Sequence, residues 1–204
     1  MVSKKQLNLT KIILITGQSG AGKSFFSSKL SEIIKESIII KTDDYYHTGI
    51  IPWFLSKTVN GYYDKLISIN ISKLNKDIRN IITDKKVIYL PKYNFKNKTR
   101  TYMKINNKNI NFVIVEGIFA FKINKLIYKN AKVKILIEDE KELCFQRRYK
   151  RDIQFRGRKI NEISIRFNQG WKIFNKLKYN KNKDIININS RNYELASIIK
   201  QILN

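Results

Sequence analysis

The sequence predicts an α/β fold in three layers, with a mostly parallel central sheet between layers of helices. Short apolar runs typical of buried strands alternate along the chain with segments of helical periodicity, which is the order that a parallel sheet requires. The chain has 204 residues, of which 43% are hydrophobic, so it is large and apolar enough for one sizeable core. We therefore expect residues 1–204 to form a single domain.

The first half of the chain begins with a predicted strand at residues 11–16, an apolar run that is stopped by Gly17. Residues 24–34 follow as a helix, because their apolar positions can all face the sheet. Three successive isoleucines at residues 38–40 predict the second strand. Isoleucines and a leucine at helical spacing then predict a helix over residues 69–82.

In the second half, residues 86–95 and 100–105 are predicted to pair as a small β-hairpin insertion, which turns around Asn97 and Lys98 within residues 86–106. Apolar runs predict two more core strands, at residues 112–115 and 134–137. The remaining predicted elements are a long charged helix over residues 140–155, a strand at residues 184–188 and an amphipathic helix over residues 193–203.

The composition excludes several classes of protein. The single cysteine and single histidine exclude a disulfide framework and a zinc site of cysteines and histidines. No apolar run approaches the roughly 20 residues of a membrane span, so we expect a cytoplasmic protein without a membrane partner. The net charge of +25 favours polyanionic partners in general, but lysine, isoleucine and asparagine supply 90 of the 204 residues. All three have A/T-rich codons, so we attribute much of the basicity to genome composition and do not expect a nucleic-acid partner.

Arginine is scarce, and its distribution is uneven. Six of the nine arginines fall within twenty residues, where a codon bias would have placed lysine: Arg147, Arg148, Arg151, Arg156, Arg158 and Arg166. The planar guanidinium group binds phosphate oxygens through two parallel hydrogen bonds, which lysine cannot do. The cluster predicts a phosphate-binding lid at about residues 140–166.

A glycine-rich loop joins the first predicted strand to the first predicted helix. Its sequence matches G-x-x-x-x-G-K-[ST] in full: Gly17-Gln18-Ser19-Gly20-Ala21-Gly22-Lys23-Ser24. Its backbone N–H groups and the helix N-terminus bind phosphate oxygens, Lys23 reaches the β- and γ-phosphates, and Ser24 is a ligand for Mg²⁺. The loop in this context predicts a P-loop NTPase fold that binds ATP or GTP.

Acidic residues follow two of the predicted strands. Asp43 and Asp44 end the second strand, and Glu116 follows the strand at residues 112–115. A kinase needs a carboxylate near the γ-phosphate to accept a proton from the attacking hydroxyl, a role that suits Asp43. Glu116 can hold Mg²⁺ directly or through water. Asp44 is either linked to the metal or a cap.

The arginine cluster completes the pattern of a kinase. Arg147 and Arg151 are one helical turn apart, and Arg148 lies three residues before Arg151, so the three can share a helix face. Gly157 predicts a bend between Arg156 and Arg158. Such a lid would close over a triphosphate and stabilise charge in the transition state.

These residues resemble the uridine kinase family, with phosphoribulokinase as its nearest cousin. Asp43-Asp44-Tyr45-Tyr46 is similar to the family segment D-S-F-Y, and Leu90-Pro91-Lys92-Tyr93-Asn94-Phe95 with Arg100 is similar to P-x-Y-D-F-x-x-H-x-R. Arg147-Arg148-Tyr149-Lys150-Arg151-Asp152, followed by Arg156-Gly157-Arg158, is close to the family lid R-R-x-x-R-D and R-G-R.

The resemblance implies phosphoryl transfer from Mg-ATP or Mg-GTP to the 5′-hydroxyl of uridine or cytidine in pyrimidine salvage, and a homo-oligomer. It implies catalysis by Asp43, Lys23, Arg151 and Arg158, with Arg147, Arg148 and Arg156 also on the nucleotide and Asp64 on the ribose. The remaining substrate-binding residues that we expect, besides Arg151, Arg158 and Asp64, are Tyr46, Tyr93, Lys98 and Arg100.

The sequence departs from the family pattern at several positions. Asp64 is followed by Lys65-Leu66, where the family has His-Pro. Lys98 stands where histidine is usual, Asn94 where aspartate is usual, and Arg166 where glutamine is common. The acceptor therefore stays open between a pyrimidine nucleoside and another small hydroxyl compound, such as the sugar phosphate of phosphoribulokinase. A nucleotide-regulated protein that binds nucleic acid is the third alternative.

Overall fold

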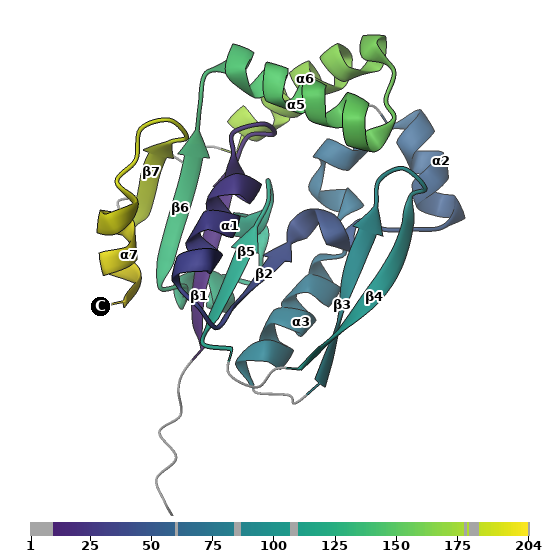
Figure 1. Ribbon diagram of the computed structural model, residues 1–204. Coiled ribbons are helices and arrows are strands. Elements are labelled where there is room, and N and C mark those ends of the chain that lie inside the picture. Colours follow the sequence, from purple (N-terminus) through teal and green to yellow (C-terminus); the bar gives the residue numbers. More distant parts are fainter. Residues whose placement is uncertain are drawn as a thin grey trace, which may run out of the picture.

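The computed structural model describes residues 10–59, 61–83, 87–106, 110–177, 179 and 184–203. Its central sheet has five strands in the order β2-β5-β1-β6-β7, and every neighbouring pair is parallel. The strands are β1 (Lys11–Gly17), β2 (Ser37–Lys41), β5 (Phe112–Glu116), β6 (Val133–Glu138) and β7 (Ile185–Asn189). The predicted three-layer α/β fold is confirmed (Figure 1).

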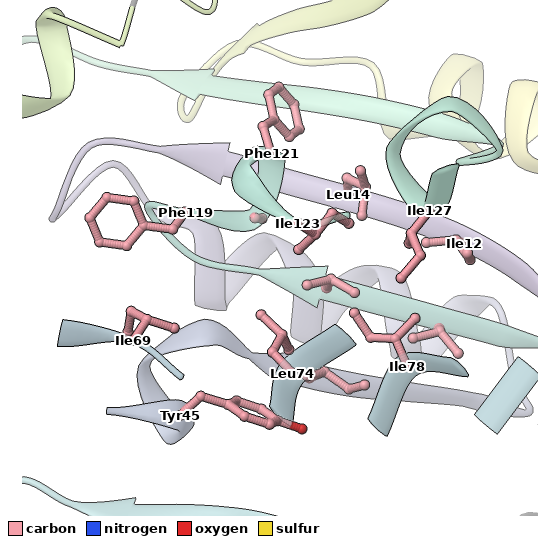
Figure 2. Close-up of a cluster of buried hydrophobic side chains, with 14 of the residues drawn as sticks. Ile12, Leu14, Tyr45, Ile69, Leu74, Ile78, Phe119, Phe121, Ile123 and Ile127 are labelled. Atoms are coloured by element: carbon pink, nitrogen blue, oxygen red, sulfur yellow. The ribbon is translucent and has the colours of Figure 1, made fainter. Parts of the chain in front are cut away.

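Both faces of the sheet are covered by helices, because the strands alternate between two apolar clusters. Ile13 and Ile15 of β1 pack with α1 and α7, whereas Ile12 and Leu14 pack with α3 and α4 on the other face. Figure 2 shows the second cluster, with Leu74 of α3 among its members. The helices are α1 (Lys23–Ile33), α2 (Ile50–Thr58), α3 (Ile71–Ile82), α4 (Lys125–Lys129), α5 (Lys141–Arg156), α6 (Ile160–Asn175) and α7 (Leu195–Leu203).

The predicted hairpin forms a separate two-stranded antiparallel sheet of β3 (Val87–Asn94) and β4 (Thr99–Asn106). Lys86, the predicted first residue of this hairpin, lies outside the described residues. The Asn94 side chain fixes the turn, since its Oδ1 accepts hydrogen bonds from the N–H groups of Lys96 and Asn97 at 2.9 and 3.1 Å. Lys98 follows with φ of +56°, a left-handed conformation that is uncommon for lysine.

The region predicted to be a lid consists of two helices, whereas a single helix was predicted there from the sequence. Helix α5 ends at Gly157, whose φ of +59° agrees with the predicted bend, and α6 then runs back along it. Both helices lie across the edge of the sheet at which the strands end (Figure 1). Helix α6 buries Ile163, Phe167 and Phe174, a spacing of four and seven residues that already has helical periodicity.

Helices α2 and α4 were not predicted either. They are short, and none of the residues of α2 is buried, so α2 has no apolar stripe facing the core. Among the described residues, no helix is long and apolar enough to cross a membrane.

The phosphate loop packs directly against the base of the lid. Gly20 has a φ of +92°, and a Cβ atom at this position would lie 2.1 Å from the carbonyl oxygen of Cys144 in α5. We expect Gly20→Ala to lower the free energy of unfolding by about 2 kcal/mol or more, through backbone strain and this clash. Gly49→Ala is the matched control, because Gly49 has a φ of +108° but no atom within 4 Å of a Cβ. Equal losses in urea unfolding of the two variants would contradict the close approach.

Candidate active site

The phosphate loop connects β1 to α1. Helix α1 begins at Lys23 behind Gly22, has no side-chain cap and no acidic residue in its first turn. The Nζ atom of Lys23 donates hydrogen bonds to the carbonyl oxygens of Gly17 and Gln18 at 3.0 and 2.8 Å. Burial lowers the pKa of Lys23, although the nearby carboxyl groups of Glu116 and Asp43 act in the opposite direction. An uncapped helix N-terminus beside a buried lysine is a site for phosphate.

Ser24 and Glu116 lie together beside this loop. The Ser24 hydroxyl donates to Oε1 of Glu116 at 2.7 Å, and Glu116 is buried at the end of β5. Burial raises the pKa of Glu116, although Lys23 and the Ser24 hydrogen bond lower it. The described residues contain no group of three or more acidic, histidine or cysteine ligands. The two oxygen donors suit Mg²⁺, which takes its other ligands from bound phosphates and water.

A cavity of about 630 Å³, here called the loop cavity, opens at the phosphate loop. The residues that line it come from the phosphate loop, the ends of β2 and β5, the hairpin and the lid: Ser19, Lys23, Ser24, Lys41, Asp43, Asp44, Lys92, Tyr93, Phe95, Glu116, Gly117, Ile118, Arg151, Phe155 and Arg156. Asp43 is partly exposed, and its Oδ2 lies 3.8 Å from the Arg156 guanidinium. The cavity thus brings the predicted base, the predicted metal ligands and two lid arginines together.

The contacts of Asp44 indicate a structural role. Its Oδ1 accepts a hydrogen bond from the Tyr93 N–H at 2.9 Å, which ties the end of β2 to the hairpin. Burial raises the pKa of Asp44, although that hydrogen bond and Lys92 lower it. Of the two roles open for Asp44, the structure favours the cap of a neighbouring backbone group.

Four lid arginines converge on one carboxylate, Asp152, which has no exposed surface. Arg151 and Arg158 approach its oxygens most closely, at 2.9 and 2.8 Å, and Arg148 and Arg156 lie at 3.5 Å. Burial by itself raises the pKa of Asp152, but the four guanidinium groups together bring it below its usual value. Asp152 therefore holds the arginines together, because without it they would repel one another.

The clustered arginines contact different parts of the protein. Arg151 donates to the Ser19 hydroxyl at 3.4 Å, and Arg156 stacks on the Phe95 ring at 3.8 Å from its centroid. Burial and the neighbouring Arg151 lower the pKa of Arg156 to about 10. Arg147 binds Asp139 and the Ser190 hydroxyl at 3.0 and 2.8 Å, on the β7 side of the loop.

The expectations for Arg148 and Asp64 need correction. Arg148 is 3% exposed and pairs with Asp64 and Asp152, both at 3.5 Å, so two carboxylates hold it inside the protein. Asp64 is also buried, and a Cβ on Gly170 of α6 would lie 2.9 Å from its Oδ1. Neither residue lines the loop cavity or the pocket described next. The pair joins the lid to the segment after α2.

A second pocket, here called the hairpin pocket, has a volume of about 420 Å³ and shares Tyr93, Phe95 and Arg156 with the loop cavity. Its complete lining is Tyr46, Ser56, Lys57, Tyr63, Tyr93, Phe95, Lys96, Lys98, Arg156, Gly157, Arg158, Lys159, Glu162 and Arg166. The expected substrate residues Tyr46, Tyr93, Lys98 and Arg158 are therefore together in this pocket. The pocket lies between the hairpin turn and the lid.

Tyr46 both lines the hairpin pocket and belongs to a packed cluster of aromatic rings. Its ring packs edge-on against the rings of Tyr63, Tyr93 and Phe95, and its hydroxyl donates to the Tyr63 carbonyl at 2.8 Å. Burial raises the pKa of Tyr46 well above its usual value. Arg100, expected on the substrate, instead donates to the Tyr46 carbonyl oxygen and lines neither pocket.

Several residues that line the hairpin pocket were not predicted from the sequence. Lys57 belongs to the unpredicted α2, and Lys159 and Glu162 lie at the start of the unpredicted α6. The missed aromatic residues, Tyr63 and Phe95, adjoin residues that were singled out, so proximity along the chain was a usable signal.

A third pocket, of about 270 Å³, lies on the other side of the phosphate loop. It is lined by Gly22, Phe25, Phe26, Ile137, Arg147, Ile188, Ser190 and Tyr193. Phe26 and Tyr193 pack edge-on with ring centroids 5.1 Å apart. Such a pocket next to the helix N-terminus offers aromatic and apolar surface for a planar base.

Comparison with known proteins shows the family of this chain. The model of the Phosphoribulokinase / Uridine kinase family matches residues 12–179. The chain belongs to this family. It is a P-loop kinase, an ATP-dependent phosphotransferase that acts on a small molecule.

Members with curated functions cover most of the chain. The uridine kinase of Borrelia turicatae (strain 91E135) is 30% identical over 162 residues, 76% of this chain and 73% of that protein. The uridine kinase of Staphylococcus aureus (strain JH9) is 27% identical over 158 residues, which are 77% of this chain and 75% of that protein.

Solved structures share the fold at low sequence identity. YFH7 from Saccharomyces cerevisiae has a TM-score of 0.67 at 13% identity, covering 88% of this chain and 92% of that one. D-glycerate 3-kinase from Cryptococcus neoformans has a TM-score of 0.60 at 13% identity, covering 87% and 86%.

The role of Asp152 predicts a large loss of stability in Asp152→Asn. Removing the buried negative charge leaves four guanidinium groups uncompensated, so we expect the free energy of unfolding in urea to fall by about 3 kcal/mol or more. The pKa of Asp152 is lowered from 3.8, so its contribution is lost only as the pH falls through that lowered value. The deficit should therefore be the same at about pH 6 and pH 8.

The control is Glu162→Gln, which removes an exposed ion pair with Arg166 at 3.7 Å. We expect a loss below about 1 kcal/mol. A deficit in Asp152→Asn as small as that of the control would show that Asp152 does not hold the arginines together.

Proposed function

We propose that this kinase transfers the γ-phosphoryl group of ATP or GTP to the 5′-hydroxyl of uridine or cytidine, a reaction of pyrimidine salvage. The observation that carries the proposal is that Asp43 lines the same cavity as Lys23, Ser24 and Glu116. The hairpin pocket beside this cavity offers the aromatic residues Tyr46, Tyr93 and Phe95 to a planar base. The two uridine kinases that resemble the chain over three quarters of its length support the same acceptor.

The donor nucleotide would bind along the phosphate loop. Its base would occupy the pocket near Phe26 and Tyr193, and its phosphates would accept hydrogen bonds from the N–H groups at the start of α1. Lys23 would exchange its contacts with the Gly17 and Gln18 carbonyls for phosphate oxygens. Arg151 and Arg156, held over the loop cavity by Asp152, would contact the transferred group.

Ser24 and Glu116 would hold Mg²⁺, which when bound neutralises charge on the phosphate oxygens. Burial raises the pKa of Glu116, and a bound cation would act in the opposite direction and favour the ionised carboxylate. Asp43 would accept the proton of the acceptor hydroxyl, and Arg156 at 3.8 Å keeps that carboxylate oriented toward the lid.

The proposed acceptor is tested with a panel of compounds in an assay coupled to ADP or GDP release. Uridine, cytidine, purine nucleosides and D-ribulose 5-phosphate are offered with ATP and then with GTP as donor. We expect uridine and cytidine to be phosphorylated with either donor or both. Turnover of other acceptors with both pyrimidine nucleosides inert would reject the nucleoside proposal and leave the kinase with another acceptor.

The role of Asp43 predicts that Asp43→Asn turns over about 10²- to 10⁴-fold more slowly, because the amide cannot accept the proton. ATP should bind with a Kd within about a factor of two of the wild type, as measured by titration calorimetry, because Asp43 is not part of the phosphate loop.

Asp44→Asn is the matched control, since its amide oxygen can keep the hydrogen bond from the Tyr93 N–H. Its turnover should fall far less. Normal turnover in Asp43→Asn, or an equal loss in both variants, would remove Asp43 as the base.

A further inference from the structure

Asp139 is a buried carboxylate that lines none of the three pockets described above. Its side chain has no exposed surface. The Ser190 hydroxyl donates to its Oδ2 atom, and Nη1 of Arg147 donates to the same oxygen at 3.0 Å. Its Oδ1 atom accepts hydrogen bonds from the Glu140 N–H at 2.9 Å and from the Asn189 amide at 3.5 Å. Both oxygens are thus satisfied by the protein, so Asp139 is closed to a ligand.

The contacts of Asp139 join segments that are far apart in the sequence. Asp139 lies between β6 and α5, Asn189 is the last residue of β7, and Ser190 begins the loop that follows. Arg147 belongs to α5. The ends of β6 and β7 are neighbours, since Glu138 pairs with Asn189 in the parallel sheet. Asp139 therefore holds α5 and the loop after β7 in a fixed relation.

The charge of Asp139 contributes to this arrangement. Burial by itself raises its pKa, but the hydrogen bonds from Ser190 and from the Glu140 N–H, together with Arg147, bring the pKa below its usual value. Asp139 is therefore ionised at neutral pH and forms an ion pair with Arg147. A charge-assisted hydrogen bond to a buried carboxylate is stronger than one between neutral groups, so it fixes the donor side chain firmly.

Arg147 is the side chain on which this arrangement bears most directly. It lines the third pocket and not the loop cavity, and it is the one charged residue among those lining the third pocket in the described part of the chain. Its Nη1 atom contacts Asp139, Ser190 and the Gly20 carbonyl oxygen. Among the described residues, its Nε and Nη2 atoms have no hydrogen-bond partner, and 36% of the side chain is exposed. These N–H groups are available to a ligand in the pocket.

The third pocket meets the phosphate loop at the two side chains that Asp139 holds. A Cβ atom on Gly22 would lie 3.3 Å from Cβ of Ser190 and 3.9 Å from Nη1 of Arg147. Gly22 directly precedes α1, whose N-terminus suits phosphate groups. Arg147 is therefore next to the point at which a bound nucleotide would leave the phosphate loop and enter the pocket.

We propose that Asp139 is a positioning residue for the nucleotide donor. It acts through Arg147, whose free N–H groups bind the nucleoside part of ATP or GTP in the third pocket, while Asp139 does not touch the nucleotide. The inference rests on the proposed placement of the donor base near Phe26 and Tyr193, and it is independent of the identity of the acceptor.

The first test is the kinetics of Asp139→Asn, because the amide keeps the size of the side chain but loses the charge that pairs with Arg147. At saturating acceptor, we expect KM for ATP to rise about 5- to 10-fold and kcat to stay within about a factor of two. KM for the acceptor should not change. Glu140→Gln is the matched control, because the neighbouring Glu140 pairs with Arg191 at 2.6 Å and both side chains are exposed. Its KM for ATP should equal that of the wild type.

Titration calorimetry without an acceptor separates positioning from damage to the fold. Mg-ATP should bind to Asp139→Asn about 5- to 10-fold more weakly than to the wild type. Inorganic tripolyphosphate can occupy the phosphate loop but has no base or ribose, so its Kd should stay within about a factor of two. Arg147→Gln should weaken ATP binding to a similar extent. Adding Asp139→Asn to Arg147→Gln should weaken it no further, because residues that act through one another are not additive.

Unchanged ATP binding in Asp139→Asn, an equal loss for ATP and tripolyphosphate, or additive losses in the double variant would overturn the proposal. If Asp139→Asn does not fold, the milder Ser190→Ala removes a hydroxyl that contacts both Asp139 and Arg147. It should weaken ATP binding about 2- to 3-fold and leave tripolyphosphate unaffected, and unchanged ATP binding would again overturn the proposal. Failure of every acceptor to react would count against the proposed function, while the calorimetry still decides the role of Asp139.

Discussion

The site depends on a carboxylate that contacts neither pocket, Asp152. Four guanidinium groups surround it, and each also contacts a different part of the site. Arg151 contacts the phosphate loop, and Arg156 contacts Asp43 and the hairpin. Arg158 lines the hairpin pocket, and Arg148 pairs with Asp64. Like charges at such short separations repel by several kcal/mol in a protein interior unless a counter-charge lies between them. One buried negative charge thus positions arginines in both the loop cavity and the hairpin pocket.

Two buried carboxyl groups in this site have opposite pKa shifts, and their surroundings explain the difference. Around Asp152 four cations outweigh burial, whereas around Glu116 burial, together with the nearby Asp43, outweighs two lysines and one hydroxyl. Asp152 is therefore a completed ion cluster, which the fold needs as it is. The positive charge near Glu116 does not offset its burial, and a divalent cation next to Ser24 would add to that charge. The same comparison separates a structural carboxylate from one suited to a ligand.

The sequence was most informative where the chemistry is local. The alternation of residues 12–15 between the two faces, and the glycine loop that follows, depend only on neighbours in the chain, so strands and loop were predictable. The orientation of Arg148 was not, because its partner Asp64 and the close approach of Gly170 come from distant segments. Helix α6 was not predicted, although its buried apolar residues recur at helical spacing. The segment was interpreted from the cationic residues that precede it instead of from this spacing.

The difference between the two pockets also indicates where specificity resides. The loop cavity balances its cations with three carboxyl groups, those of Asp43, Asp44 and Glu116. In the hairpin pocket the cations stay unbalanced, at positions supplied by the hairpin turn, α2 and α6. These elements lie outside the central sheet, so their residues can change without disturbing β1 or the phosphate loop. Lys98 and Arg166, which depart from the family pattern that the sequence otherwise follows, both lie there. The uneven balance of charge is therefore the physical property that distinguishes the hairpin pocket from the loop cavity.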